Sequence, residues 1–554
     1  MSLIRLAVLA ALILVAMPAT AHAATAPGRV VYSVALQVPR QDAGATVVSP
    51  AVALPDGGAV IVPNDDLTAV RLRADGSLEP SFGNGGIAHI AVPGAVFTAI
   101  QVLRQPGGRL VVVGAGPDEA SSGVPRLVVV GLTATGALDT TFGTGGFTVT
   151  DVEPTCDFGA CHIAALGPDG SIVVTGTRGQ LSPDADLGNS DEERPEWVVR
   201  RLSPTGAVDA SFGLVKIPGV ARSGTEGTAA VVRPTGQIVV LGSHASIAQV
   251  AGLTPAGKPD PSFGGGRPVR VAGSVETDLL LHASGKVDVL TGSQIWRFQS
   301  GGALDRAYGK GGVVDLDPVD TGNNLPQLAD GGGDATILQW IPTYEPGPPV
   351  RPRLGVLRVS PAGALGGAAR LPFAFGGGYA SDLGETTGSV EQNTFSGELL
   401  ARPDGSYLVV GGVRLIRLTT SLSGSSAGYV AVAALTPALG PDPSFGGPAS
   451  APRATVTLAS QRASSTVALR GVLARVTASG AGLLRVSVRD PSGRILARRT
   501  EAVYAAGTTR MRVTLTKAGK RLLRRARDLR VRARYEFRDL VAGRSDGEAT
   551  ARLR

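Results

Sequence analysis

The sequence has little cysteine, histidine, aromatic side chain or charge. Its 554 residues contain 2 Cys and 5 His, 4% are aromatic, and only 18% are charged. A chain that is 43% hydrophobic and so poor in charge does not have the composition of a disordered protein. Its 76 glycines follow no three-residue period, which excludes a collagen-like helix. Beyond the N-terminal segment no apolar run could span a bilayer, so we expect no transmembrane segment there.

What the sequence has in excess is glycine and proline, with 76 Gly and 38 Pro. Together with frequent valine, these residues predict many short strands joined by tight turns. The length allows several ordinary domains, or one large repeat array followed by a small domain.

The first 23 residues read as a secretory signal peptide. Arg5 supplies a positive charge, an apolar run extends from Leu6 to Met17, and Ala21-His22-Ala23 forms a small-residue cleavage signature. We therefore expect the mature chain to begin at Ala24 and to be secreted, or held at the cell surface non-covalently. The alternative is a membrane anchor, which the run disfavours because it is shorter than the ~20 apolar residues that span a bilayer.

The two cysteines, Cys156 and Cys161, lie close together in the segment CDFGAC. In an exported chain such a pair is more often a disulfide than two free thiols, and we interpret it as a staple on one loop. The alternative is a redox or metal site that includes His162, although a metal would need further ligands.

A motif of the form L-x-x-x-G-x-x-D-x-S-F-G recurs seven times in matching register, which indicates a repeat protein. The first and last aromatic positions are 363 residues apart over six intervals, a mean near 60. The aromatic positions are Phe82, Phe142, Phe212, Phe263, Tyr308, Phe375 and Phe445.

Each repeat carries a second turn upstream, such as PDGG at Pro55, and strand-like runs flank both turns. One unit therefore reads as strand A, turn, strand B, connection, strand C, turn, strand D. Seven such units predict an all-β fold with a seven-bladed β-propeller over residues 24–450, and a linear solenoid is the alternative. The run VVYSVALQV, from Val30 to Val38, precedes the first complete unit and is placed to close the ring as the outer strand of the last blade.

These units resemble the delta-60 repeat, a secreted bacterial repeat with G-x-L-D-x-S-F-G at its core, and also NHL-type propeller units. The resemblance covers about residues 30–448. It implies a propeller architecture and a generic binding or scaffolding role, because the repeat carries no catalytic residues.

The repeated residues have structural explanations. We expect the aromatic rings to pack between adjacent blades and the glycines to permit sharp turns. The repeated acidic residue is interpreted as a turn cap, in preference to repeated active sites. These acids are Glu79, Asp139, Asp209, Asp260, Asp305 and Asp442.

The long insertions all fall in the B–C or D–A connections, which share one face of a propeller, and variable loops on one face are where binding usually occurs. The B–C insertions are 115–125, 179–195, 341–352 and 418–428, and the D–A insertions are 155–160, 319–324 and 376–394. One of these loops is acidic, and Asp184, Asp186 and Asp191 are candidate Ca²⁺ ligands. Their spacing departs from the EF-hand pattern, and a solvated acidic loop is the alternative.

The sequence carries no known catalytic motif and no metal-ligand spacing around its histidines, so we predict no catalytic residue and, apart from the candidate Ca²⁺ ligands above, no metal or other cofactor. The first functional hypothesis is a secreted, non-enzymatic binding or scaffold protein whose ligand or protein partner lies on the insertion-bearing face. The second is an extracellular propeller enzyme acting on carbohydrate or another polar substrate, which requires carboxylates or histidines to converge at the channel mouth. The third is a structural component of a surface layer.

From about Ala451 the repeat stops, and apolar residues alternate with arginine and serine, as in LLRVSVRD. This alternation predicts half-buried strands, and we expect a small β-sandwich over residues 451–554. One helix is predicted from Lys517 to Arg527, capped by Thr516. The domain looks like Ig-like modules of exported bacterial proteins, without a diagnostic motif.

Charge divides sharply at this boundary. Residues 451–554 contain 24 Lys and Arg against 7 Asp and Glu, a net charge of +17, whereas residues 24–450 contain 28 against 38, a net charge of −10. An anionic cell-envelope polymer or membrane surface is a better partner for the basic domain than nucleic acid, which an exported protein rarely meets. Two alternatives remain: docking of the basic domain on the acidic propeller, and an arginine preference that only reflects composition bias.

Overall fold

The fold is described from a computed structural model, for most of the chain from residue 50 onward and for two short N-terminal segments. The described residues are 22–24, 31–36, 50–62, 67–90, 97–117, 125–154, 162–179, 196–218, 225–244, 247–272, 276–316, 327–340, 355–366, 369–370, 390–395, 398–418, 424–440, 442, 444–445, 453–479, 482–503, 507–525, 528–539 and 544–554.

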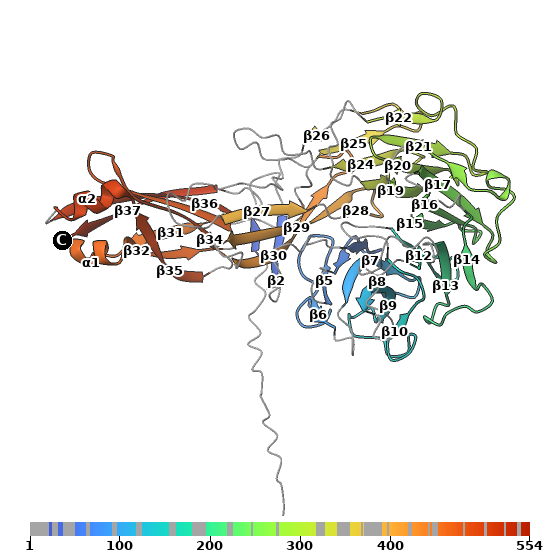
Figure 1. Cartoon of the computed structure of the whole chain (residues 1–554), viewed down its shortest axis with the longest axis horizontal. Coiled ribbons are helices and arrows are strands. Elements are labelled where there is room, and N and C mark those ends of the chain that lie inside the picture. The colour runs from blue at the N-terminus through green and yellow to red at the C-terminus, as the bar shows by residue number, and fades with distance from the viewer. Residues whose placement is uncertain are drawn as a thin grey trace, which may run out of the picture.

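Seven antiparallel sheets follow one another along the chain and form a seven-bladed β-propeller, as the repeat predicted (Figure 1). In the first six blades the strands pair in the order A, B, C, D. These strands are β3 (Ala51–Ala53), β4 (Ala59–Ile61), β5 (Thr68–Leu72) and β6 (Ile87–His89); β7 (Thr98–Arg104), β8 (Leu110–Pro117), β9 (Pro125–Leu132) and β10 (Phe147–Val149); β11 (Ala164–Leu166), β12 (Ile172–Arg178), β13 (Glu196–Leu202) and β14 (Leu214–Lys216); β15 (Thr225–Val232), β16 (Ile238–His244), β17 (Ile247–Leu253) and β18 (Val269–Arg270); β19 (Glu276–Leu281), β20 (Val287–Thr291), β21 (Gln294–Phe298) and β22 (Val313–Asp315); β23 (Gln327–Asp330), β24 (Thr336–Trp340), β25 (Gly355–Val359) and β26 (Ala369–Arg370). A 3₁₀ turn, η1 (Gly264–Gly266), precedes β18.

The seventh blade contains strands from both ends of the propeller. Its core strands are β28 (Leu399–Ala401), β29 (Tyr407–Leu418) and β30 (Gly424–Leu435). β2 (Val31–Leu36) pairs with β30 as the outer strand, so the N-terminal run does close the ring. β1 (His22–Ala24), which crosses the expected cleavage site, pairs with β2.

The last blade differs from the expectation that 418–428 and 376–394 are loop insertions. β29 and β30 stay paired from Tyr407↔Leu435 to Leu418↔Gly424, and β27 (Val390–Phe395) pairs alongside β29. The run YLVVGGVRLIRL of β29 is rich in apolar and β-branched residues, and the strand continues through Gly411 and Gly412 past the usual blade length. The strand contacts β34 (Ile495–Val503) of the C-terminal domain (Figure 1).

Adjacent blades meet where the motif aromatic ring of one packs against the C–D turn of the next. The rings of Phe142 and Phe445 are fully buried. A Cβ placed on Gly206 would lie 2.5 Å from the Phe142 ring, and one on Gly76 would lie 2.9 Å from the Phe445 ring, so only glycine fits. The buried rings of the described repeats are Phe82, Phe142, Phe212, Phe263, Tyr308 and Phe445, and Phe375 lies outside the described residues.

The C-terminal region is a seven-stranded antiparallel sheet that curls around one apolar core, in keeping with a β-sandwich. Its strand order is β31-β32-β35-β34-β33-β36-β37, and the first strand also contacts the last. The strands are β31 (Ala454–Leu458), β32 (Gly471–Ala478), β33 (Gly482–Arg489), β34 (Ile495–Val503), β35 (Gly507–Leu515), β36 (Leu529–Asp539) and β37 (Arg544–Leu553).

Two short helices accompany this sheet, where the sequence predicted one. The Thr516 hydroxyl caps α2 (Lys517–Leu523) by accepting a hydrogen bond from the Gly519 N–H at 2.9 Å. α2 ends at Leu523, four residues earlier than predicted. α1 (Ala463–Ala468) was not predicted, because it is only 6 residues long and has no side-chain cap. In the described part of the chain, no helix has the length and apolarity to cross a membrane.

The ring-on-glycine contact gives a stability prediction. Gly206→Ala should lower the free energy of unfolding by about 2–3 kcal/mol, because the new methyl group clashes with the Phe142 ring and the backbone φ is positive. Gly145→Ala is the matched control: its φ is +68° but nothing lies within 4 Å, so it should cost only about 1 kcal/mol. Denaturant unfolding compares the two, and equal losses would contradict the packing role of Gly206.

Candidate functional site

The first strand of each blade lines the propeller axis, and successive first strands contact one another all the way round, β28 meeting β3. Near the insertion-bearing end of these strands, polar side chains accept hydrogen bonds from the backbone of the next blade. In each pair the side chain accepts and the backbone donates: Gln101 from the Ala164 N–H at 2.8 Å, Asp278 from the Leu328 N–H at 2.7 Å, Gln327 from the Leu399 N–H at 2.9 Å, and Glu398 from the Ala51 backbone. These bonds join adjacent blades around the axis.

His162 links the third blade to the fifth. It stands just before β11, and its Nδ1 lies 2.6 Å from Oδ1 of Asp278 in β19. The intervening blade presents the small residues Ala229 and Ala230, and the Ala230 N–H donates to the His162 carbonyl. The Asp278 side chain is 3% exposed, whereas the His162 side chain keeps 28%, so the imidazole is the accessible part of the pair.

Glu398, just before β28 of the seventh blade, is the third ionisable residue of this group, which we call the axial cluster: His162, Asp278 and Glu398. It is 3% exposed, and its Oε1 has no hydrogen-bond partner among the described residues. Burial raises the pKa of Glu398 to about 8 against the opposing effect of the His162 charge. Leaving a deeply buried carboxyl oxygen without a hydrogen bond costs folding free energy. The Glu398 side chain is therefore a candidate ligand-binding group.

The electrostatics of the axial cluster favour a charged histidine beside a neutral acid at pH 7. Burial opposes the charged form of His162, but the Asp278 carboxylate outweighs it and raises the pKa of His162 to about 9. The cluster therefore offers one imidazolium N–H donor and one protonated carboxyl group. These groups can bind a polar ligand, and they can also hold or move a proton.

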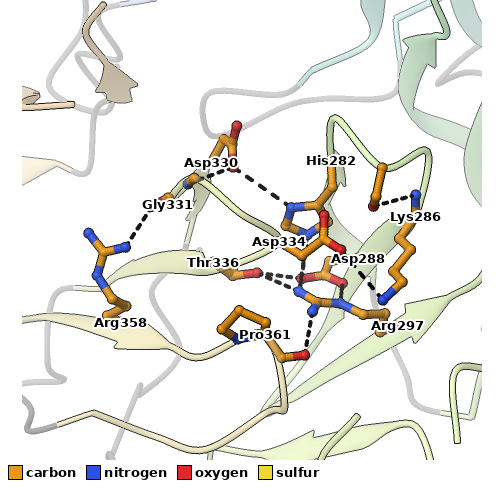
Figure 2. Close-up of polar contacts among 12 residues, drawn as sticks. His282, Lys286, Asp288, Arg297, Asp330, Gly331, Asp334, Thr336, Arg358 and Pro361 are labelled. Atoms are coloured by element: carbon orange, nitrogen blue, oxygen red, sulfur yellow. Dashed lines mark hydrogen bonds and ion pairs between the residues drawn. The ribbon is translucent and has the colours of Figure 1, made fainter. Parts of the chain in front are cut away.

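A second polar cluster lies at the opposite, turn-bearing end, between the fifth and sixth blades (Figure 2). Arg297 is fully buried and binds both carboxylate oxygens of Asp288, at 2.6 and 2.7 Å. Its guanidinium also donates to the Pro361 carbonyl of the next blade at 3.0 Å and lies 3.9 Å from the centre of the Tyr308 ring. His282 Nε2 lies 3.0 Å from Asp288 Oδ2. The bonds of Arg297 are all made within and between the two blades, so its role is to join them.

A hollow of about 500 Å³ also lies at this turn-bearing end, between the second and third blades. Arg109 in its wall donates to Asp139 at 2.7 Å and to the Pro204 carbonyl at 3.0 Å. Gln105 donates to the Gly170 and Pro204 carbonyls. The polar groups that line the hollow are therefore engaged with one another rather than directed at a ligand.

The repeated motif acids act within their own turns. Asp209 accepts hydrogen bonds from the Ser211 N–H and hydroxyl and from the Phe212 N–H, and its other oxygen binds Arg201. The Ser211 hydroxyl and the Arg201 guanidinium lower the pKa of Asp209 to about 2. The same serine or threonine contact occurs at Glu79, Asp139, Asp260 and Asp442, and Asp305 accepts from the Ala307 N–H.

The other residues singled out from the sequence cannot be placed. Cys156, Cys161 and the acidic-loop residues Asp184, Asp186 and Asp191 lie outside the described residues. Within the part that is described, no group of three or more His, Cys, Asp or Glu is arranged to hold a metal ion.

Sequence reasoning missed Asp278 and Glu398. The available signal was an acidic residue placed just before the apolar run of a first strand, in ETDLLL and in SGELLA, where four of the other units carry an amide or an apolar residue. His162 was noted only because it is next to a cysteine.

One segment of the chain matches a propeller family, and several solved structures are distantly similar. Residues 105–142, from the A–B turn of the second blade to Phe142, match a family described as a domain of unknown function (DUF5122) beta-propeller. No curated protein matches the chain. Among solved structures, the apo prolyl oligopeptidase B from Galerina marginata is similar, with 10% identity and a TM-score of 0.37 over 78% of this chain and 55% of that one.

Two further solved structures cover most of their own length. A protein of unknown function from Dyadobacter fermentans DSM 18053 has 10% identity and a TM-score of 0.34, covering 73% of this chain and 99% of that one. A glucose dehydrogenase has 15% identity and a TM-score of 0.29, covering 71% and 98%. The chain spans about half the length of the prolyl oligopeptidase. Likeness at this level assigns no activity.

The axial cluster predicts that stability falls as the pH rises from about 4.5 to about 9. Both folded-state pKa values lie above the ordinary ones, 4.5 for Glu398 and 6.5 for His162, so the folded state holds the protons more tightly. The Glu398 contribution is present below pH 4.5 and is lost as the pH rises to about 8, and that of His162 is present below pH 6.5 and is lost by about 9. Thermal unfolding from pH 5 to 9 should show Glu398→Gln flattening the slope between pH 5 and 6.5, where His162 does not titrate. Parallel wild-type and variant curves would contradict this assignment.

Proposed function

We propose that the chain is a secreted, non-enzymatic β-propeller that binds a ligand or protein partner on the face carrying the B–C and D–A insertions. The observation that carries this proposal is the difference in location and hydrogen bonding between two groups of acidic side chains in the propeller. The repeated motif acids hydrogen-bond within their own turns and Asp288 binds Arg297 at the turn-bearing end, whereas Asp278 and Glu398 lie with His162 at the insertion-bearing end of the axis. Besides joining adjacent blades, this cluster leaves the His162 imidazole accessible and one Glu398 oxygen without a hydrogen-bond partner among the described residues.

Three finer points belong to the same proposal. The repeat is of the delta-60 kind, which the match to a propeller family of unknown function supports. The C-terminal sheet is an Ig-like accessory module. The N-terminal signature directs the protein out of the cell, and the basic domain, with 24 Lys and Arg against 7 Asp and Glu, retains it on an anionic polymer of the envelope.

Ligand binding is tested with the secreted full-length chain on a glycan array and on purified envelope polysaccharide. Replacing insertion 179–195 by a glycine-serine linker of equal length should reduce binding by about tenfold or more, because an insertion on the binding face is removed. Thr205→Ala and Lys258→Ala, on exposed turns of the opposite face, should bind like wild type. Binding that survives in the linker variant but fails in the turn variants would place the ligand on the wrong face and reject the proposal.

A second candidate is an extracellular propeller enzyme acting on carbohydrate or another polar substrate, and the axial cluster favours it specifically. A histidine and two carboxyl groups do converge at the insertion-bearing end, which this hypothesis required. If it is correct, His162→Gln should lower turnover of a polysaccharide or lactone panel by about 10²–10⁴-fold, the usual contribution of a general acid or base. Thr68→Val, which removes a hydroxyl near His89 away from the axis, is the control. Wild-type protein that turns over none of the panel would reject this candidate.

A further inference from the structure

Arginines stand directly opposite each other at more than one place in the C-terminal sheet, and the pair formed by β32 and β35 differs from the others in having no acid on its strands. On β32 and β35 the side chains alternate between the core and solvent. Val476 and Val513 point inward, while Arg475, Arg510 and Arg512 are exposed. Arg475 is the cross-strand partner of Arg510, and Arg512 lies two positions further along the same face.

This arrangement works against the stability of the sheet. Directly opposed residues on antiparallel strands have their Cβ atoms only about 4.5–5.5 Å apart, and like charges there are destabilising. Burial does not account for the pair, because both arginines are exposed. A repulsive pair retained at the centre of a regular sheet therefore points to an anionic partner that neutralises it.

The described residues of β31, β32 and β35 provide no carboxylate, and Glu501 of the adjoining strand β34 binds Arg499. The other exposed residues on this side of β31, β32 and β35 are threonines and Leu473, and Thr477 and Thr508 bond each other at 2.8 Å. None of the described residues exposed on these three strands is acidic, and no side-chain partner is found for Arg475, Arg510 or Arg512 within the described residues. We call this surface the basic face: Arg475, Arg510 and Arg512 with Thr455, Thr457, Thr477, Thr508 and Thr514.

Opposed arginines elsewhere in the sheet have a carboxylate beside them: Arg530 of β36 faces Arg552 of β37, and Arg489 of β33 faces Arg532 of β36. On β36 and β37, Arg534 binds Glu548 at 2.7 Å, Arg532 lies 3.5 Å from the same carboxylate, and Arg552 binds Asp528 at 2.8 Å. A uniform composition bias toward arginine would not pair the cations with acids on one side and leave them without acids on the other. The arginines of the domain are therefore not spread evenly among its acids: some have carboxylate partners and those of β32 and β35 do not.

We propose that the basic face binds a linear phosphodiester polymer of the cell envelope, of the polyol-phosphate type; this rests on the envelope-retention role proposed above. The planar guanidinium fork matches phosphate oxygens in two parallel hydrogen bonds. Strand neighbours about 4.8 Å apart and same-face residues about 6.8 Å apart along a strand suit anions repeated along one chain. The small threonines let such a chain approach closely and offer hydroxyl donors.

The features of this face favour a polyol phosphate over a nucleic acid. The described residues of the basic face include no aromatic side chain on which a base could stack. The face is a regular strand surface rather than a helix that could enter a groove. Recognition is thus limited to the anions of a backbone.

The test measures binding of the full chain to purified polyol-phosphate wall polymer, with duplex DNA and polyglutamate as competitors. R475Q/R510Q/R512Q should weaken binding by about tenfold or more and reduce its dependence on salt. The matched control is R532Q/R534Q/R552Q, which changes the net charge equally but removes arginines that already have carboxylate partners. The control should bind within about threefold of wild type.

The possible negative results distinguish failure of the basic face from failure of the envelope-retention role. If both triple variants lose affinity equally, net charge alone governs binding and the basic face is rejected while envelope retention stands. If the wild type does not bind the polymer at all, the retention role itself fails. Preferred binding of DNA or polyglutamate would overturn the phosphodiester-polymer assignment. Misfolding is excluded by thermal unfolding of both triple variants, which should unfold cooperatively like wild type. The single variant R475Q should be at least as stable as wild type because a repulsive pair is removed.

Discussion

The propeller depends on one contact that is repeated around the ring: an aromatic side chain from the outer turn of one blade against a glycine in the C–D turn of the next. The Phe142 ring occupies the space that a Cβ on Gly206 would need, and the Gly143 N–H donates to the Thr205 carbonyl beside it. The same contact between Phe445 and Gly76 joins the last blade to the first. The seventh blade has Leu439, also at positive φ, at the turn position where the other blades have glycine, so the ring closes with this contact at most of its junctions rather than at all of them.

Arginine reinforces these junctions by two routes. Arg201 and Arg297, on the third strand of their blades, stack over the motif ring and donate to a carbonyl of the next blade. In the second blade the third strand has Gly131 at the position of these arginines, and an arginine from outside that strand makes the same two contacts. Arg109 then lies over Phe142 and donates to the Pro204 carbonyl. The guanidinium is thus conserved in space although its position in the sequence changes, because the ring face and the carbonyl it binds are fixed by the fold.

Charge has different roles in the two parts of the molecule. In the propeller, most of the described acids serve turns and blade junctions, which leaves the axial cluster as an exception that the architecture does not require in every blade. In the C-terminal sheet, Arg532, Arg534 and Arg552 bind acids along β36 and β37, whereas the opposed arginines of β32 and β35 have no acid on their strands. This distribution is consistent with two separate sites: a ligand site at the propeller axis, and an anion-binding face on the C-terminal domain that retains the protein on the envelope.

The sequence by itself determined the architecture, because turn residues and aromatic rings repeat at a local spacing and each unit makes its own blade. It also predicted the Thr516 cap and the N-terminal closing strand. Only the tertiary structure revealed the axial cluster, because His162 and Asp278 are 116 residues apart in the sequence. They meet at the axis because the blade between them presents the small residues Ala229 and Ala230 there. The long hairpin of β29 and β30 and the arginine pair of the basic face likewise depend on strand register, which long-range pairing sets and local pattern does not.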